Sequence, residues 1–232
     1  MKQLLLSAAL AAGVSLAACA PPASETEAPA VEAPPVEVAA PTGEYTLDKT
    51  HASLTVKVTH FGLSHYTLRF TDMDATLNFN AEDPAASSVT ATVNIPSIET
   101  DYPGETNFDA ELQNSDWLNA AANPVATFQS TSIEMTGPAT ATMTGDLTIN
   151  GQTHPATFDV TYNNSYAQHP FGYPVALIGF SAHGTINRSD YGVTQYVPEP
   201  GSLLGVSDDV ELIIEAEFTK PVEAAPEEAS GE

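Results

Sequence analysis

Six histidines are the side chains in this 232-residue sequence that are best suited to bind a metal ion. A zinc site needs three or four ligands that converge on one point. His60 and His65 are close in the sequence, but they lack the i,i+2 spacing that puts two side chains on one face of a strand. The other four histidines are dispersed. We therefore predict neither a metal site nor a required cofactor.

Residues for nucleophilic catalysis are equally sparse. The sequence has no Gly-x-Ser-x-Gly elbow and no glycine-rich loop that would hold a phosphate. Serine, histidine and aspartate are present, but not in an order that indicates a catalytic triad. We predict that the chain is not an enzyme.

Cys19 is the single cysteine, which excludes a disulfide framework. It follows an apolar stretch too short to span a bilayer comfortably, and Leu16-Ala17-Ala18-Cys19 resembles a bacterial lipobox. We predict that residues 1–18 are a signal peptide and that Cys19 carries the lipid. The alternative is an ordinary signal peptide cut near Ala18. Because Ala20 rather than Asp follows the cysteine, we expect a periplasm-facing lipoprotein, with the outer membrane favoured over the inner.

Two segments have a composition that cannot form a core. Residues 20–43 hold six prolines and four glutamates without a basic or aromatic residue, which is typical of a disordered, extended spacer. We expect residues 19–43 to tether the acylated cysteine to a folded domain over residues 44–220. Residues 221–232 are predicted to be a disordered acidic tail.

The charge balance limits the partners. Thirty acidic residues against six basic ones give a net charge of -24. Nucleic-acid binding needs clustered Lys and Arg, so we exclude it. Adhesion to anionic lipid heads through protein charge is excluded for the same reason, and the expected membrane contact is through the acyl chains.

Apolar and polar residues alternate with period two through most of the domain, as in Leu54, Val56 and Val58 or in Val210, Leu212 and Ile214. We predict eight or nine antiparallel strands, with a tight hairpin turn at Asn150-Gly151. One region differs, because Phe108 and Leu112 have helical spacing. It predicts a short helical insertion around residues 105–120.

Closure into a barrel would remove exposed strand edges, although a two-sheet sandwich also accepts this pattern. Many inward positions are small, which would leave room for a ligand inside an eight-stranded barrel. Packing of these residues against larger neighbours is the alternative. The small positions are Ala75, Ala91, Ala139, Ala141, Gly145, Ala156, Ala176, Ala182 and Ala216.

A series of short motifs resembles the YceI-like family. They are Tyr45-Thr46-Leu47-Asp48 with His51, Val58-Thr59-His60-Phe61-Gly62, Ser97-Ile98-Glu99-Thr100, Leu112-Gln113-Asn114-Ser115-Asp116-Trp117, Pro124, Thr127-Phe128-Gln129-Ser130-Thr131, Gly145-Asp146-Leu147-Thr148-Ile149-Asn150-Gly151, Ile186-Asn187-Arg188-Ser189-Asp190-Tyr191-Gly192, and Asp208-Asp209-Val210. Each is weak alone, but their order and spacing over residues 44–219 are specific. The resemblance implies an all-β, extended eight-stranded antiparallel lipocalin-like barrel whose apolar channel holds an isoprenoid tail. His51 and His60 match family positions and are expected to hydrogen-bond backbone at the barrel ends.

The sequence departs from the family pattern at three positions. Phe108 and Glu111 stand where many members have Arg and His, so two partners for an anionic headgroup are missing. This favours a neutral head such as a quinone ring or an alcohol over a pyrophosphate. Leu68 replaces a glycine and is expected to change a local bulge.

Strand parity and the family pattern give candidate ligand contacts. The expected cavity residues are Phe79, Phe128, Phe158, Tyr162, Ile178 and Phe180, with Trp117 closing one end. Arg188 has two interpretations: it touches the ligand head at the channel mouth, or it pairs with Asp190 to fix the strand end.

The leading functional hypothesis is a membrane-anchored envelope protein that sequesters or carries an isoprenoid lipid or quinone. A non-catalytic interaction or stress-response module without lipid is the first alternative, and a lipid- or quinone-modifying enzyme is the second. A homodimer is a plausible assembly.

Overall fold

A computed structural model describes residues 37–223 of the chain. The predicted signal peptide, Cys19 and most of the predicted tether and acidic tail lie outside these residues. Within them, no helix is long and apolar enough to cross a membrane.

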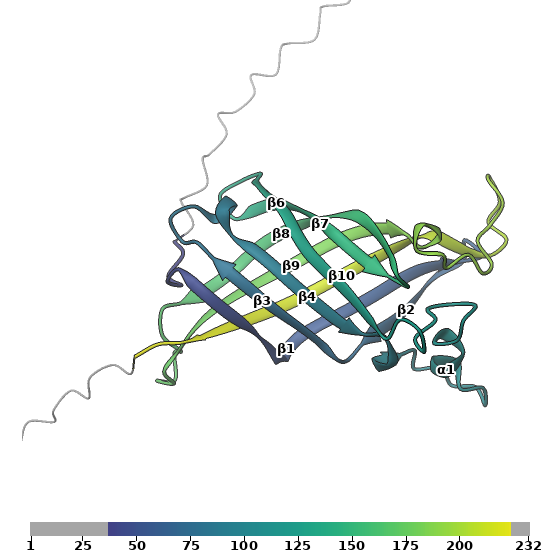
Figure 1. Cartoon of the computed structure of the whole chain (residues 1–232), viewed down its shortest axis with the longest axis horizontal. Coiled ribbons are helices and arrows are strands. Elements are labelled where there is room, and N and C mark those ends of the chain that lie inside the picture. The colour runs from purple at the N-terminus through teal and green to yellow at the C-terminus, as the bar shows by residue number, and fades with distance from the viewer. Residues whose placement is uncertain (1–36, 224–232) are drawn as a thin grey trace, which may run out of the picture. The chain divides into compact units, whose positions relative to one another are not determined.

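The described residues form one antiparallel sheet that closes on itself (Figure 1). Its order is β10-β9-β8-β7-β6-β4-β3-β1-β2-β5, and β10 also pairs with β1, so eight strands complete a barrel while β2 and β5 extend from it. This confirms the predicted all-β barrel. The strands are β1 (Gly43–His60), β2 (Ser64–Phe70), β3 (Met73–Phe79), β4 (Ser88–Asn94), β5 (Ile98–Glu99), β6 (Val125–Met135), β7 (Thr140–Ile149), β8 (Gln152–Tyr166), β9 (Val175–Asn187) and β10 (Val206–Pro221).

Strand β1 serves two neighbours on one edge. Its first part pairs with β3 from Gly43 to Thr46, and its second part pairs with β2 from Leu54 to His60. On its other edge it pairs with β10 along most of its length, with a register shift between Leu47 and Ala52. Residues 43–60 therefore form one long strand. The β1–β2 register is continuous at Leu68, so this chain has no bulge there.

Local sequence explains the connections. Asn150 and Gly151 both have positive φ (50° and 73°), as a type I′ turn between β7 and β8 requires. The helix α1 (Phe108–Leu112) lies in the predicted insertion, and the Asn107 side chain accepts from the Ala110 backbone N–H as its N-cap. Three 3-10 turns complete the elements: η1 (Pro84–Ala86), η2 (Ile95–Ser97) and η3 (Arg188–Tyr191).

Each end of the barrel has its own buried cluster. At the end where β8 connects to β9, here named the β8–β9 end, Tyr45, Phe79, Ile178 and Phe218 pack together. At the opposite end, named the β7–β8 end, the cluster is formed by Leu54, Val56, Leu147, Ala156, Phe158, Ile186, Tyr191 and Val210.

Residues 37–42, here named the N-terminal strap, pack across the β8–β9 end. Ala40 is only 1% exposed, and the backbone N–H groups of Ala39 and Ala40 both donate to Ser165 Oγ at 2.8 and 3.1 Å. Tyr45 donates its hydroxyl to the Pro41 carbonyl at 2.6 Å, and burial raises the pKa of Tyr45 to about 12. The predicted disordered tether over residues 19–43 is therefore wrong for residues 37–43. The composition of these residues predicted a spacer, but hydrogen bonds to Ser165, which is distant in the sequence, keep them packed on the barrel.

Candidate functional site: an apolar cavity inside the barrel

The barrel encloses a cavity of about 240 Å³ between the two buried clusters. Its walls come from all eight closing strands, from η1 and from the strap. The lining residues are Val38, Leu47, Leu54, Met73, Ala75, Leu77, Phe79, Pro84, Ser87, Val89, Ala91, Thr92, Val93, Phe128, Ile133, Met135, Pro138, Ala139, Thr140, Ala141, Met143, Leu147, Phe158, Val160, Tyr162, Phe180, Ala182, Leu212, Ile214, Ala216 and Phe218.

Small side chains on paired strands make the space. Ala91 lies opposite Ala75 on β3, and Ala182 lies opposite Val160 on β8 and Ile214 on β10. Ala216 faces Phe180 across the β9–β10 pair. Because inward residues of neighbouring strands meet in register, several alanines at one level leave a gap that side chains do not fill.

Near the β7–β8 end, two glycines instead allow aromatic rings to fill the interior of the barrel. A Cβ on Gly184 would lie 2.7 Å from the Phe158 ring, and a Cβ on Gly145 would collide with the Phe128 ring. Phe128 and Phe158 meet edge to face at 5.4 Å between ring centroids. The two glycines thus leave room for these rings, and both rings line the cavity.

The cavity reaches the surface at the side of the barrel near its β8–β9 end. Strand β4 pairs with β6 only as far as Thr90 and Gln129, and a register shift follows in β6 at Ser130. The Val89 backbone N–H donates to Ser130 Oγ at 2.9 Å, beyond the last β4–β6 pair. The rest of β6 and the start of β7 form a hairpin without β4 beside it. Met135 on this hairpin lines the cavity and is 46% exposed, and Pro84 of η1 lines the cavity as well. We infer that the cavity opens beside the hairpin and η1, and we name this opening the mouth.

The lining is almost entirely hydrocarbon. Its polar side chains are Ser87, Thr92, Thr140 and Tyr162, and the Tyr162 hydroxyl already shares a hydrogen bond with Ser165 Oγ at 2.7 Å. Among residues 37–223, no Lys or Arg side chain lines the cavity. Such a cavity can take up an elongated apolar molecule with a neutral head, because it offers no cation to an anionic group.

Five of the eight predicted contact residues line the cavity: Phe79, Phe128, Phe158, Tyr162 and Phe180. The other three do not. Ile178 has the inward parity, but it is 1% exposed inside the cluster at the β8–β9 end, beyond the cavity. Trp117 does not line the cavity, and it lies at the β7–β8 end, where its ring centroid is 6.1 Å from that of Tyr196.

Arg188 is a buried structural residue. It lies in η3 rather than on a strand, and its guanidinium donates to the carbonyls of Ser207 (2.9 Å), Val193 (2.8 Å) and Val206 (2.8 Å). Burial lowers its pKa, and the Asp208 carboxylate opposes this shift. Arg188 therefore does not line the cavity, and its guanidinium is occupied by these carbonyls. The structural interpretation holds for Arg188, but its partners are backbone carbonyls and not Asp190, which is exposed.

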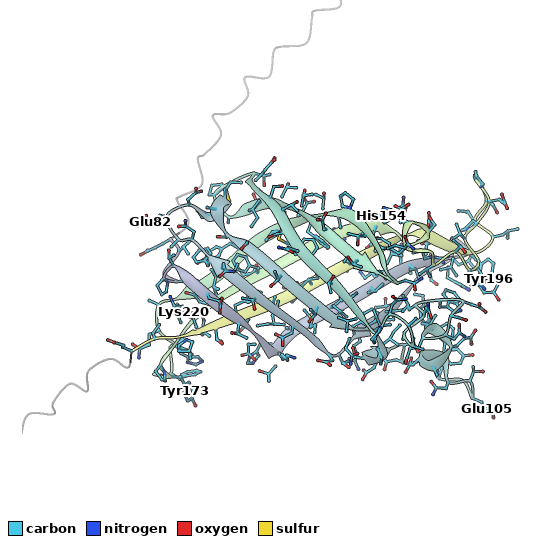
Figure 2. The ribbon with its side chains drawn as sticks, in the orientation of Figure 1. Glu82, Glu105, His154, Tyr173, Tyr196 and Lys220 are labelled. Carbon is cyan, nitrogen blue, oxygen red and sulfur yellow. The ribbon has the colours of Figure 1, made fainter. Side chains whose placement is uncertain are left out.

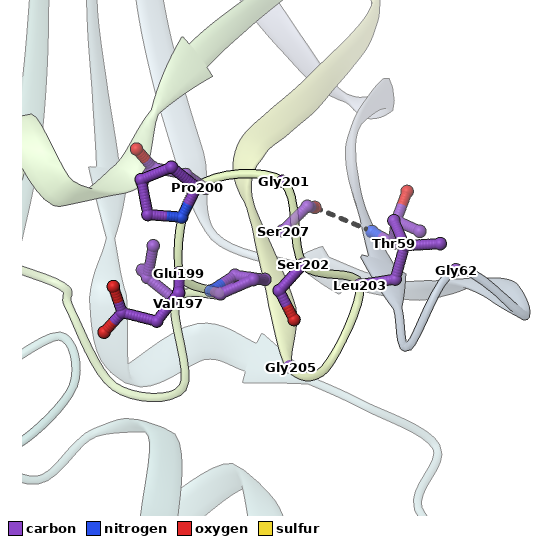
Figure 3. Close-up of a pocket in the computed structure, with 12 residues that line it drawn as sticks. Thr59, Gly62, Val197, Glu199, Pro200, Gly201, Ser202, Leu203, Gly205 and Ser207 are labelled. Atoms are coloured by element: carbon purple, nitrogen blue, oxygen red, sulfur yellow. Dashed lines mark hydrogen bonds between the residues drawn. The ribbon is translucent and has the colours of Figure 1, made fainter.

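A second pocket of about 250 Å³ lies in the loop that precedes β10, at the β7–β8 end (Figure 3). It is formed largely by residues 197–205, and the Thr59 backbone N–H donates to Ser207 Oγ at its wall. Glu199 and Asp208 border it. We prefer the barrel cavity as the functional site, because the barrel walls enclose it and exclude charge.

The histidines do not converge on one site. Among the described residues, one group of potential ligands lies close together: Asp48, His51 and Glu217, on the outside of the barrel. His51 Nδ1 lies 2.8 Å from Asp48 Oδ2. Its expected backbone hydrogen bond is therefore wrong, and the partner is this carboxylate. Asp48 also accepts from Thr50, so side-chain hydrogen bonds explain the grouping without an ion.

Sequence reasoning missed the residues of the mouth. Ile133, Met135, Pro138 and Pro84 line it, yet only the first two lie on a strand, and both belong to its exposed half. The alternating pattern predicted that Ile133 and Met135 point inward. It could not predict that β4 and β6 stop pairing beside them, which exposes this part of β6. Met73 and Met143 were also missed, although both lie at inward positions of their strands.

Comparison with known proteins agrees with this architecture. The YceI-like domain pattern matches residues 45–218, which is nearly the whole barrel. The chain belongs to the YceI-like domain family. It is 35% identical to Protein YceI of Escherichia coli over 176 residues, covering 75% of this chain and 85% of that protein.

Two solved structures resemble this YceI-like barrel. The Campylobacter jejuni YCEI protein aligns with a TM-score of 0.59 and 28% identity, over 71% of this chain and 90% of the other. A polyisoprenoid binding domain from Saccharophagus degradans aligns with a TM-score of 0.55 and 14% identity, over 76% of this chain and 98% of that domain. At 14% identity, the similarity to the second structure shows only that the two proteins share a fold.

The departures from the family pattern lie far from the mouth. Phe108 in α1 packs against Tyr66 (6.1 Å between centroids) and Tyr102 (5.4 Å) at the β7–β8 end, and Glu111 is exposed. The absence of positive charge at Phe108 and Glu111 therefore does not affect the electrostatics of the mouth of this YceI-like barrel. The preference for a neutral head instead rests on the uncharged lining.

Proposed function

We propose that this YceI-like barrel binds an isoprenoid lipid or quinone by burying its tail in the cavity, and that it sequesters or carries this lipid in the bacterial envelope. The observation that carries the proposal is the apolar cavity with its side mouth. The same fold occurs in a polyisoprenoid binding domain from Saccharophagus degradans, so the fold is compatible with this ligand class.

The volume of the cavity limits the number of tail carbon atoms that can be buried. One water-sized group needs roughly 10–15 Å³ of such space. The volume of about 240 Å³ therefore accommodates on the order of 20 carbon atoms, or about four isoprene units. Each buried CH₂ contributes about 0.8 kcal/mol, so contact area rather than specific bonds provides the affinity. A longer tail would continue through the mouth.

The head of the ligand is proposed to be neutral. Ser87 and Thr140 offer hydroxyl groups near the mouth, while Glu82, Asp83 and Glu134 on the adjoining segments bring negative charge. A quinone or an alcohol can accept or donate a hydrogen bond there without meeting these carboxylates as a like charge.

Mass spectrometry of an organic extract of the full chain, purified from envelopes without added lipid, tests the proposal. We expect a stoichiometric long-chain isoprenoid or quinone. A chain that repeatedly carries no such lipid, and that takes up none from a quinone-containing extract, would support the lipid-free interaction module instead.

A cavity-filling variant localises the binding. Ala91→Phe adds a ring at an inward position between Ala75 and Phe128, and we expect it to lower the bound lipid at least tenfold. Thr90→Phe adds the same ring at the neighbouring exposed position and should retain the lipid. Equal lipid content in the two variants would contradict binding in the cavity.

The membrane anchor at Cys19 is part of the proposal. It predicts that cells fed a labelled fatty acid transfer the label to this protein, and that Cys19→Ser abolishes the labelling. Fractionation of the two membranes then tests the preference for the outer one.

A further inference from the structure

The loop between β8 and β9 exposes aromatic side chains. Phe171 is 86% exposed and Tyr173 is 62% exposed. An exposed Phe in a folded domain loses the benefit of burial, so two such rings on one loop indicate a surface that meets a partner.

Hydrogen bonds hold this loop in one shape. The Phe171 backbone N–H donates to His169 Nδ1 at 3.1 Å, and the His169 N–H donates to the Val175 carbonyl at 2.7 Å. The His169 ring lies 5.5 Å from the Phe171 ring and 4.9 Å from the Tyr173 ring. The rings are thus presented by a fixed turn.

Charge restricts the nature of the partner. Residues 160–189 contain neither Asp nor Glu, in a chain with thirty acidic residues. Their one basic residue is Arg188, which is buried at the other end. The loop itself therefore carries no Asp, Glu, Lys or Arg side chain, although Lys220 on β10 pairs with Ala176 close to it. The interfacial region of a bilayer accepts aromatic rings in this way.

The loop lies at the same end of the barrel as the mouth. The Tyr162 backbone N–H on β8 donates to the Ala139 carbonyl in the β6–β7 hairpin, which joins β8 to the rim of the mouth. Figure 2 shows Tyr173 and Glu82 at this end and Tyr196 and Glu105 at the other. The strap, through which the chain leads toward Cys19, crosses this end as well.

We infer that Phe171 and Tyr173 rest in the interface of a lipid bilayer and turn the mouth of the barrel toward the membrane surface. A tail can then pass between bilayer and cavity with little exposure to water. The inference builds on the proposed function. Because Glu82, Asp83 and Glu134 lie at the same end, the fitting surface is zwitterionic rather than anionic.

The β7–β8 end also exposes apolar side chains, among them Leu63 and Leu204 at 84% and 79%. Carboxylates accompany them, including Glu105, Asp116 and Glu199. This end provides a matched control for the β8–β9 loop.

The test uses the full chain on phosphatidylcholine vesicles whose acyl chains carry bromine, which quenches nearby tryptophan. Trp117, the single tryptophan, lies at the β7–β8 end and should not be quenched. Phe171→Trp adds a second tryptophan, and we expect it to lose roughly half of its total emission because one of two rings enters the interface. Leu204→Trp should lose little.

Absence of extra quenching in vesicle-bound Phe171→Trp would overturn the inference and make a protein the better partner for the loop. Stronger quenching of Leu204→Trp would overturn it in favour of the opposite end, and failure of the full chain to float with the vesicles would also overturn it. The lipid extract stays independent of these outcomes, so failure here is distinguishable from failure of the proposed function.

Discussion

Arg188 shows how one buried charge holds the β7–β8 end together. Its guanidinium satisfies the carbonyls of Val193, Val206 and Ser207, and its Cζ lies 5.9 Å from the centre of the Trp117 ring. The planar arrangement of its five N–H groups is what a lysine cannot reproduce. The residue therefore fixes the start of β10 and the loop before it.

Arg188→Met should lower the free energy of unfolding by about 2–4 kcal/mol, because three carbonyls lose their charged donor. Chemical denaturation of the full chain measures this. The lipid content of the folded variant should be unchanged, since Arg188 is outside the cavity. The control is Arg69→Met, which removes an exposed pair with Glu99 and should change stability little. Loss of lipid in folded Arg188→Met would contradict this assignment.

The Asp48–His51 pair gives a pH dependence on the outer surface. Hydrogen bonds from Thr50 and then His51 lower the pKa of Asp48, and the hydrogen bond to Asp48 raises the pKa of His51. The stabilisation of the fold by the lowered pKa of Asp48 is complete above the ordinary aspartate pKa. It is lost as the pH falls through the lowered pKa. The stabilisation of the fold by the raised pKa of His51 is complete below the ordinary histidine pKa. It is lost as the pH rises through the raised pKa.

The pair should therefore stabilise the fold most between roughly pH 4 and 6.5. In thermal unfolding, His51→Gln should have a lower Tm than the unchanged chain in this range, and the difference should shrink above neutral pH. A difference that stays constant from pH 5 to pH 9 would contradict the assignment. Because His51 is exposed, the effect is expected to be small.

At the scale of elements, the N-terminal strap closes the β8–β9 end through Ser165. One hydroxyl accepts from two backbone N–H groups and also bonds to Tyr162, which lines the cavity. The strap itself contributes Val38 to the lining and Ala40 to the buried cluster. The barrel end is thus covered by a segment that precedes the first strand.

Ser165→Ala should destabilise the fold by about 1–3 kcal/mol, because the buried Ala40 N–H loses its acceptor. We also expect faster loss of bound lipid, because the strap is released from the end of the cavity. Thr161→Ala, at an exposed position of the same strand, is the matched control. Hydrogen exchange of residues 37–42 measures the release directly, and unchanged protection would contradict the role of Ser165.

For the whole molecule, the net charge of -24 produces repulsion that the fold must tolerate. The Debye length falls from about 30 Å at 0.01 M salt to roughly 3 Å at 1 M. Sodium chloride should therefore raise the Tm over this range, since residues 37–223 form few ion pairs that salt could screen. Thermal unfolding at several salt concentrations checks this, and a Tm that falls with salt would contradict it.

The sequence by itself determined the strand pattern, the Asn150-Gly151 turn, the short helix at Phe108–Leu112 and most of the aromatic lining. These features depend on period-two alternation and on local backbone preferences, which neighbouring residues carry. The five predicted residues that line the cavity, such as Phe128 and Phe180, follow from the parity of their strands.

Only the tertiary structure decided where the cavity ends and opens. Ile178 and Phe180 share one parity, but the strap and Tyr45 cover the first while the second remains beside the open space. The mouth arises because β4 stops pairing with β6 at Gln129. Arg188 is buried because the start of β10, 18 and 19 residues later in the chain, packs against it and accepts its hydrogen bonds. Contacts between residues distant in the sequence set these features, and alternation within one strand carries no information about them.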